Sequence, residues 1–160
     1  MSQWQIDKRW SDRFLPEIKR ILGEYLIAEA PFDEDAEHNT DLIVLRLAAV
    51  RIACRVRKHE YIARYGGEFT IRSGRPSGAK TELTKIIEGW GDYLFYAFSD
   101  DAELHLAKWI LGDLRAFRLF INRELAAGRK PWLAKDNHDN SSSFLCFQYS
   151  VMPGFVVAEK

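Results

Sequence analysis

The stretch DLIVLRLAAVRIACRVR, residues 41–57, constrains the fold more than any other part of the chain. Two runs of β-branched and aliphatic residues flank a set of small residues, a pattern typical of a β-hairpin. The second run alternates, so its apolar and arginine side chains fall on opposite faces of the predicted strand. One face carries Ile52, Cys54 and Val56, and the other carries Arg51, Ala53, Arg55 and Arg57. The sequence therefore predicts a strand with one basic face.

The turn of this hairpin decides which residues face each other. If residues 48–50 form a three-residue turn, Asp41 lies opposite Arg57 and Ile43 lies opposite Arg55, all on one face of the sheet. One interpretation is a cross-strand ion pair that contributes at most about 1 kcal/mol to stability. The other is a functional site in which an acid and two arginines lie together.

Helical and strand patterns alternate along the rest of the chain. Apolar spacing predicts helices over 11–28, 81–90 and 115–125, and strands over 68–73, 93–99 and 143–151. Residues 107–114 fit either a further strand or the continuation of a helix that starts at Ser99, and the polar segment 128–142 is predicted to be a loop. The order is helix, three strands, helix, one or two strands, helix, strand. We therefore expect a single α/β domain over residues 1–160, with a mixed sheet and a core over about 11–151.

Composition constrains the compartment of this protein more than its partners. The 160 residues include 23 Lys and Arg and 23 Asp and Glu, so the net charge of zero gives no overall preference for nucleic acid or membrane. Charge is nevertheless segregated, because residues 46–80 hold nine basic residues against two acids, while residues 32–41 are acidic. The two cysteines lie in apolar runs, which is typical of reduced cysteines in an intracellular protein. The sequence also shows no leader pattern and no apolar run long enough to span a membrane. We therefore expect a cytoplasmic protein without a membrane partner.

The octet GRPSGAKT, residues 74–81, is close to the phosphate-binding P-loop pattern G-x-x-x-x-G-K-[ST]. Ala79 stands where the pattern has its second glycine, and its Cβ would crowd the approach to a phosphate. Pro76 removes one backbone N–H from the loop. Nucleotide binding is therefore the last of the functions that the sequence suggests. A helix N-terminus beside Arg75 and Lys80 still suits a phosphate of a nucleic-acid backbone.

The order of elements and the phrase TDLIVLRLAAVRIACRVR resemble the core of the PD-(D/E)XK nuclease superfamily. The later WILGDLRAFR and SSSFLCFQYS are similar to the ending of its phage and restriction members. This resemblance implies a restriction-endonuclease-like core and a Mg²⁺-dependent DNA endonuclease. By this comparison Asp41 matches the metal-binding Asp, Arg57 the lysine position, and Arg55 the position of the second acid.

The arginine at the position of the second acid is a departure from the family pattern, because it removes a metal ligand and repels Mg²⁺. Glu68, which opens the next predicted strand, is the best replacement, and Glu24 or Glu29 on the first helix are further candidates. The resemblance thus implies Asp41 and Glu68 as metal ligands, with Arg57 steadying the scissile phosphate.

Without a metal, the basic face can still bind DNA, because arginines contact phosphates and the rings of Tyr61 and Tyr65 can stack. The candidate nucleic-acid-binding residues are Arg51, Arg55, Arg64, Arg72, Arg75 and Lys80. An alternative is a non-catalytic phage or mobile-element module that inhibits a host protein, with the acidic segment 32–41 as one candidate contact. The remaining aromatic residues, Trp90 among them, are expected in the core.

Overall fold

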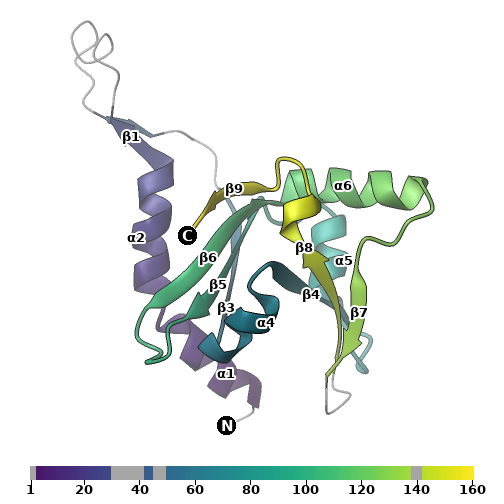
Figure 1. The fold of residues 1–160 in the computed structure, drawn as a ribbon, viewed down its shortest axis with the longest axis horizontal. Helices are drawn as coiled ribbons and strands as arrows, with labels where there is room; N and C mark the ends of the chain where they lie inside the picture. Colours follow the sequence, from purple (N-terminus) through teal and green to yellow (C-terminus); the bar gives the residue numbers. More distant parts are fainter. Residues whose placement is uncertain (1–2, 30–41, 45–49, 138–141) are drawn as a thin grey trace, which may run out of the picture. The chain divides into compact units, whose positions relative to one another are not determined.

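The computed structural model describes residues 3–29, 42–44, 50–137 and 142–160 (Figure 1). Its contacts divide the chain into two compact units, Met1–Ala49 and Val50–Lys160. Helices and strands alternate in the described residues, so the α/β class is confirmed. The assignment of residues 1–160 to a single domain stays a prediction.

The first unit begins with two helices where the sequence predicts one. Helix α1 spans Gln3–Asp12 and helix α2 spans Leu15–Leu26, so a continuous helix over 11–28 is wrong. Pro16 explains the break, because proline has no N–H for the carbonyl of the preceding turn and is tolerated in the first turn of a helix. Glu17 in that first turn suits the positive end of the helix dipole.

Strands β1 (Ile27–Glu29) and β2 (Leu42–Val44) form an antiparallel pair in the first unit. Asp41 lies outside the described residues, as does most of the predicted hairpin turn at 48–50. β2 pairs with β1 and β3 pairs with β5, so the predicted hairpin that places Ile43 opposite Arg55 is wrong: Ile43 lies opposite Ala28. The alternation of a strand sets its faces but does not specify its partner. The place of Asp41 relative to Arg57 stays a prediction.

The second unit contains a four-stranded mixed sheet. Its strands in spatial order are β3 (Ile52–Arg57), β5 (Tyr93–Ser99), β6 (Leu106–Asp113) and β9 (Val156–Glu159). β3 runs parallel to β5, whereas β5 with β6 and β6 with β9 pair antiparallel. The strand alternative for 107–114 is therefore confirmed. The sequence does not predict β9, because a four-residue edge strand is too short for a clear alternation.

An antiparallel sheet of three strands is the other layer of the second unit. Its order is β4 (Glu68–Gly74), β8 (Ser143–Gln148) and β7 (Leu133–Asp136). β4 and β8 confirm predicted strands, but β7 lies in the segment 128–142, so the prediction of a loop is wrong there. Most side chains of β7 are exposed, and backbone hydrogen bonds to β8 hold it, so it leaves no apolar alternation in the sequence.

Helices α5 (Glu82–Ile87) and α6 (Leu114–Ala126) begin at side-chain caps. Thr81 Oγ1 accepts a hydrogen bond from the backbone N–H of Thr84 at 3.3 Å, which confirms the predicted cap of α5. Asp113 caps α6 in the same way. In the described part of the chain, no helix is long and apolar enough to cross a lipid bilayer.

Short helical turns fill the connections of the second unit. A 3-10 turn, η1 (His59–Tyr61), leads directly into helix α4 (Ile62–Tyr65) between β3 and β4. A second 3-10 turn, η2 (Tyr149–Val151), follows β8, so the predicted strand over 143–151 ends three residues early.

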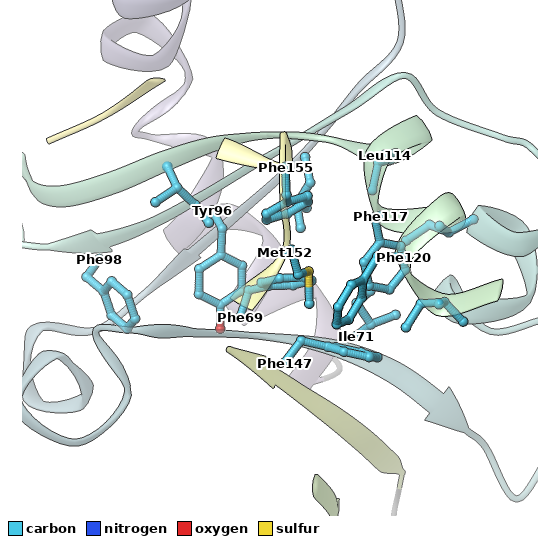
Figure 2. Packing of buried hydrophobic residues seen from close by; sticks show 14 residues of the cluster. Phe69, Ile71, Tyr96, Phe98, Leu114, Phe117, Phe120, Phe147, Met152 and Phe155 are labelled. Carbon is cyan, nitrogen blue, oxygen red and sulfur yellow. The ribbon is translucent and has the colours of Figure 1, made fainter. Parts of the chain in front are cut away.

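Phe69 of β4 lies at the centre of the aromatic core of the second unit (Figure 2). Its ring stacks on Phe147 at 5.4 Å and on Phe155 at 4.8 Å between centroids. Gly112 of β6 lets this core close, because a Cβ there would lie 2.2 Å from the Phe155 ring. This contact ties the C-terminal segment to the sheet.

Candidate functional site

An open pocket of about 360 Å³ lies in the second unit at the start of β3. Residues at that start, in the turn before α5, in α5 itself and just after it form its walls. The charged side chains that line it are four bases, Arg51, Arg75, Lys80 and Lys85, and one acid, Glu82. Three of the six predicted nucleic-acid-binding residues therefore lie around one pocket.

The octet 74–81 forms a tight turn at this pocket. Gly78 has a φ of +67°, a conformation that favours glycine, and its N–H donates to the carbonyl of Arg75 at 3.1 Å. The turn then leads into the Thr81 cap of α5. The sequence thus places Arg75 and Lys80 on a short, defined connection between β4 and α5.

Trp90 adds an exposed aromatic ring to the pocket, so the prediction that it packs in the core is wrong. The residue is 59% exposed and stands between Gly89 and Gly91, whose φ angles are +94° and +83°. Such a pair of glycines marks a tight turn, and this signal was available in the sequence. The guanidinium of Arg51 lies 5.8 Å from the centroid of the indole, within cation–π range.

The backbone beneath these two side chains is held by hydrogen bonds. The N–H of Arg51 donates to Asp92 Oδ2 at 2.8 Å, and its carbonyl accepts from the N–H groups of Asp92 at 2.9 Å and Tyr93 at 3.2 Å. From α6, Arg118 Nη1 donates to the carbonyl of Gly91 at 3.3 Å. The backbone on which the Arg51 guanidinium and the Trp90 ring are carried is therefore fixed by hydrogen bonds.

The two lysines of the pocket differ in their surroundings. Lys80 Nζ contacts both carboxylate oxygens of Glu88, at 2.7 and 2.8 Å, but its side chain is 66% exposed. Such exposed pairs contribute about 0.2 to 1 kcal/mol, so a phosphate can compete for this lysine. Lys85 was not predicted as a site residue, because a single lysine in a helix gives no signal until the neighbouring chain is placed.

Arg55 lies on the same face of β3 as Arg51, but its side chain is used within the fold. Nη1 donates to the carbonyl of Thr70 at 2.8 Å, and Nη2 pairs with Glu82 Oε2 at 2.7 Å. Glu82 Oε2 also accepts from the backbone N–H of Arg72 at 3.2 Å. β4 is an edge strand, and unpaired backbone groups on such an edge invite wrong pairing. The Arg55–Glu82 pair therefore protects the edge of β4.

Arg72 connects this ion pair with the pocket. Burial lowers the pKa of its guanidinium, as do the nearby charges of Arg75 and Arg55, while Glu82 opposes the shift. Its Nε is buried and has no hydrogen-bond partner in the described ranges, and its guanidinium lies 5.5 Å from the ring centroid of Phe144. Arg72 and Arg75 therefore form one positive region beside the Arg55–Glu82 pair.

Two of the predicted residues lie at the other end of β3, near α4. The guanidinium of Arg57 lies 4.4 Å from the ring centroid of Tyr61, and its Nη1 donates to Tyr96 Oη at 3.4 Å. The guanidinium of Arg64 lies 5.2 Å from the ring centroid of Tyr65. The structure thus separates these arginines from the pocket.

Glu68, the predicted metal ligand, has one carboxylate oxygen, Oε2, that is buried and has no hydrogen-bond partner among the described residues. Glu68 and Arg57 both act on the thiol of Cys146. Burial raises the pKa of this thiol, the charge of Glu68 raises it further, and the charges of Lys135 and Arg57 lower it. The described residues contain no group of three or more His, Cys, Asp or Glu that could hold a metal ion. Asp41 lies outside them, so the Mg²⁺ site of Asp41 and Glu68 stays a prediction.

Comparisons with protein-family models, with curated proteins and with solved structures give no match for this chain. Membership of the PD-(D/E)XK superfamily and a restriction-endonuclease-like core therefore stay predictions. Its function has to be inferred from its own side chains.

Proposed function

We propose that this protein binds DNA through the pocket at the start of β3. Phosphates contact Arg51, Arg75 and Lys85, and a base stacks on Trp90. The observation that carries this proposal is the exposed indole, 59% accessible, beside the Arg51 guanidinium at 5.8 Å in a pocket with four bases and one acid.

The charge of the pocket favours an anion. Its single acid, Glu82, is already bound to Arg55 and to the backbone N–H of Arg72, so it does not neutralise the lining lysines and arginines. Phosphates bound by such side chains release counterions, and this release drives the association of proteins with nucleic acids. The pocket therefore supplies the sequence-independent part of DNA binding.

The exposed tryptophan favours an unstacked base beside the phosphate. A base on an aromatic side chain contributes about 1 to 3 kcal/mol, because every base has a flat π face that can stack. The hydrogen bonds of Asp92 fix the backbone of Arg51, and the backbone N–H of Trp90 donates to the carbonyl of Lys85 at 3.0 Å, so the chain that carries the ring is held before binding. An apolar ring, a cation and an open pocket together fit a nucleotide unit of a DNA strand.

A free nucleotide fits the pocket less well than a strand. Ala79 and Pro76 depart from the loop that wraps a triphosphate, and Lys80, the counterpart of its lysine, pairs with Glu88. The pocket is also open, which leaves room for a chain to enter and leave. If the pocket binds a mononucleotide but no DNA strand, the proposal that DNA is its ligand is wrong.

Fluorescence anisotropy with a labelled DNA oligonucleotide tests the proposal over a range of salt concentrations. We expect R51Q/R75Q to reduce the salt slope by about 1.4, since each phosphate contact on a single strand contributes about 0.7. K130Q/K160Q is the matched control, because it removes two charges from exposed positions of the second unit that do not line the pocket. An equal reduction of the salt slope in both variants would contradict the proposal. Binding of a free nucleotide by a protein that does not bind the DNA oligonucleotide would contradict it too.

A second candidate function is metal-dependent cleavage of the bound DNA. The observation that favours it is the buried Oε2 of Glu68, which has no donor among the described residues, with Glu68 and Arg57 both acting on the Cys146 thiol. With Asp41, this oxygen would hold the Mg²⁺ that activates water for phosphodiester hydrolysis. Nicking of plasmid DNA in Mg²⁺ or Mn²⁺ tests it: D41A and E68Q should abolish cutting, and equal cutting by wild type and D41A would overturn it.

A further inference from the structure

Three cations converge on one tyrosine ring at the end of β3 away from the pocket. Lys135 Nζ lies 4.4 Å from the ring centroid of Tyr65, the guanidinium of Arg64 lies at 5.2 Å, and that of Arg57 lies at 5.8 Å. None of the three forms an ion pair with a carboxylate of the described residues. We call these three side chains and Tyr65 the tyrosine cluster.

The tyrosine cluster concentrates like charges that no carboxylate of the described residues neutralises in an ion pair. Cation–π contacts with a tyrosine contribute about 0.5 to 1 kcal/mol at exposed sites, so they position the cations without cancelling their charge. Glu68 acts on the same thiol, Cys146, as Arg57 and Lys135, but no hydrogen bond or ion pair joins it to either of them in the described part of the chain. A phosphate at this cluster would relieve the mutual repulsion of the cations.

The tyrosine cluster and the pocket lie at opposite ends of one strand face. Arg51 and Arg57 are six residues apart on the same face of β3, which at about 3.3 Å per residue places their backbones about 20 Å apart. In the interval, Arg55 and Glu82 form an ion pair, and Arg72 adds one positive charge between Arg55 and Arg75. The interval is therefore net positive, and it joins two groups of cations of which only Lys80 forms an ion pair with a described carboxylate.

We infer that a single strand of DNA runs along β3, from the pocket to the tyrosine cluster, with a phosphate at each end. This inference rests on the proposed function, and it extends that function from one nucleotide unit to a strand. A length of about 20 Å corresponds to about six nucleotides at the 3.4 Å rise of a stacked strand, and to fewer when the strand is extended. A single strand fits better than a duplex, because only an unpaired base can stack on Trp90.

Thymidine oligonucleotides of two, four, six and eight nucleotides test this inference by anisotropy. We expect affinity to rise tenfold or more between two and six nucleotides and then to level off. R64Q/K135Q, which leaves Arg57 and its hydrogen bond to Tyr96 intact, should reduce affinity for the longer oligonucleotides to near that of the dinucleotide. The dinucleotide should bind this variant as it binds the wild type, because it reaches only the pocket.

The control is K130Q/K160Q, which removes two charges from exposed positions of the second unit outside the pocket lining and the tyrosine cluster, and it should bind all lengths like the wild type. Equal affinity from two to eight nucleotides, with R51Q/R75Q still impaired, would overturn the strand path and leave the pocket. Equal loss of all lengths in R64Q/K135Q would also overturn the path. Absence of binding at every length would overturn both the path and the proposed function.

Discussion

Arg51 and Arg55 lie on the same face of the same strand, yet their surroundings give them different roles. Arg55 spans from β3 to the edge of β4, where it binds the Thr70 carbonyl and Glu82. Arg51 lies against an exposed tryptophan in a pocket whose only acid is taken by Arg55. The comparison teaches that one arginine of a basic strand binds an acid within the fold, while the guanidinium of the other forms no ion pair with a described carboxylate.

The largest expected effect is on stability at Arg55. R55A should lower the free energy of unfolding by about 2 kcal/mol, because it leaves Glu82 and the Thr70 carbonyl without their partner in a partly buried place. R51A should change it by less than about 0.5 kcal/mol, since that side chain lines an open pocket. Urea denaturation of both variants measures the difference.

The control for this prediction is a double-mutant cycle with E82A. We expect a coupling energy of about 1 kcal/mol or more between Arg55 and Glu82, and about 0.5 kcal/mol or less for the exposed pair of Lys80 and Glu88. Similar stability losses in R55A and R51A would remove the distinction between the two arginines.

Trp90 should carry the next largest effect, on binding rather than stability. W90A should weaken DNA binding about tenfold, in keeping with the loss of about 1 to 3 kcal/mol of stacking, and W90F should retain most of it. L104A is a matched control, because Leu104 is also a large exposed apolar residue, at 70%. Binding by W90A that equals that of L104A would show that the ring does not contact DNA.

Arg75 allows a test of phosphate contact by a single side chain. R75Q should reduce the slope of log K against log salt by about 0.7, the value for one contact on a single strand. R55Q, if it folds, should reduce the slope less, because its charge is already paired with Glu82. A larger slope change in R55Q than in R75Q would reverse the comparison.

The smallest effect is expected at Glu88, which competes with DNA for Lys80. E88Q should raise DNA affinity about twofold, since an exposed ion pair holds the lysine by about 0.2 to 1 kcal/mol. Titrations at low salt measure this gain, and it should disappear in E88Q/K80Q. A loss of affinity in E88Q would show that the carboxylate itself takes part in binding.

Strong local patterns made much of the second unit predictable. The apolar run at 93–99 forms β5, and the run at 115–125 forms most of α6. The predicted cap at Thr81 is the start of α5. β7 and β9 escaped prediction because both are short strands held mainly by backbone pairing with a neighbour. The parallel pairing of β3 with β5 escaped it for a similar reason, since no side-chain pattern names the partner of a strand.

The sequence predicted which kinds of residue form the site, but it did not predict how these residues are arranged in space. The alternation of residues 51–57 identified a basic face, yet it could not show that Arg55 would pair with Glu82, because that contact joins three elements. Trp90 is exposed because the glycines on both sides of it form a tight turn. The prediction placed it in the core because tryptophan is hydrophobic, and it gave less weight to these glycines. Lys135 was hidden because it lies on a strand that reads as a loop.

The most direct test of DNA binding at the pocket is photo-crosslinking with a single strand that contains 5-iodouracil, followed by mass spectrometry of the linked peptides. The account predicts crosslinks at Trp90 that disappear in high salt and in R51Q/R75Q. Crosslinks confined to segments away from β3 and α5, unchanged by R51Q/R75Q, would contradict it.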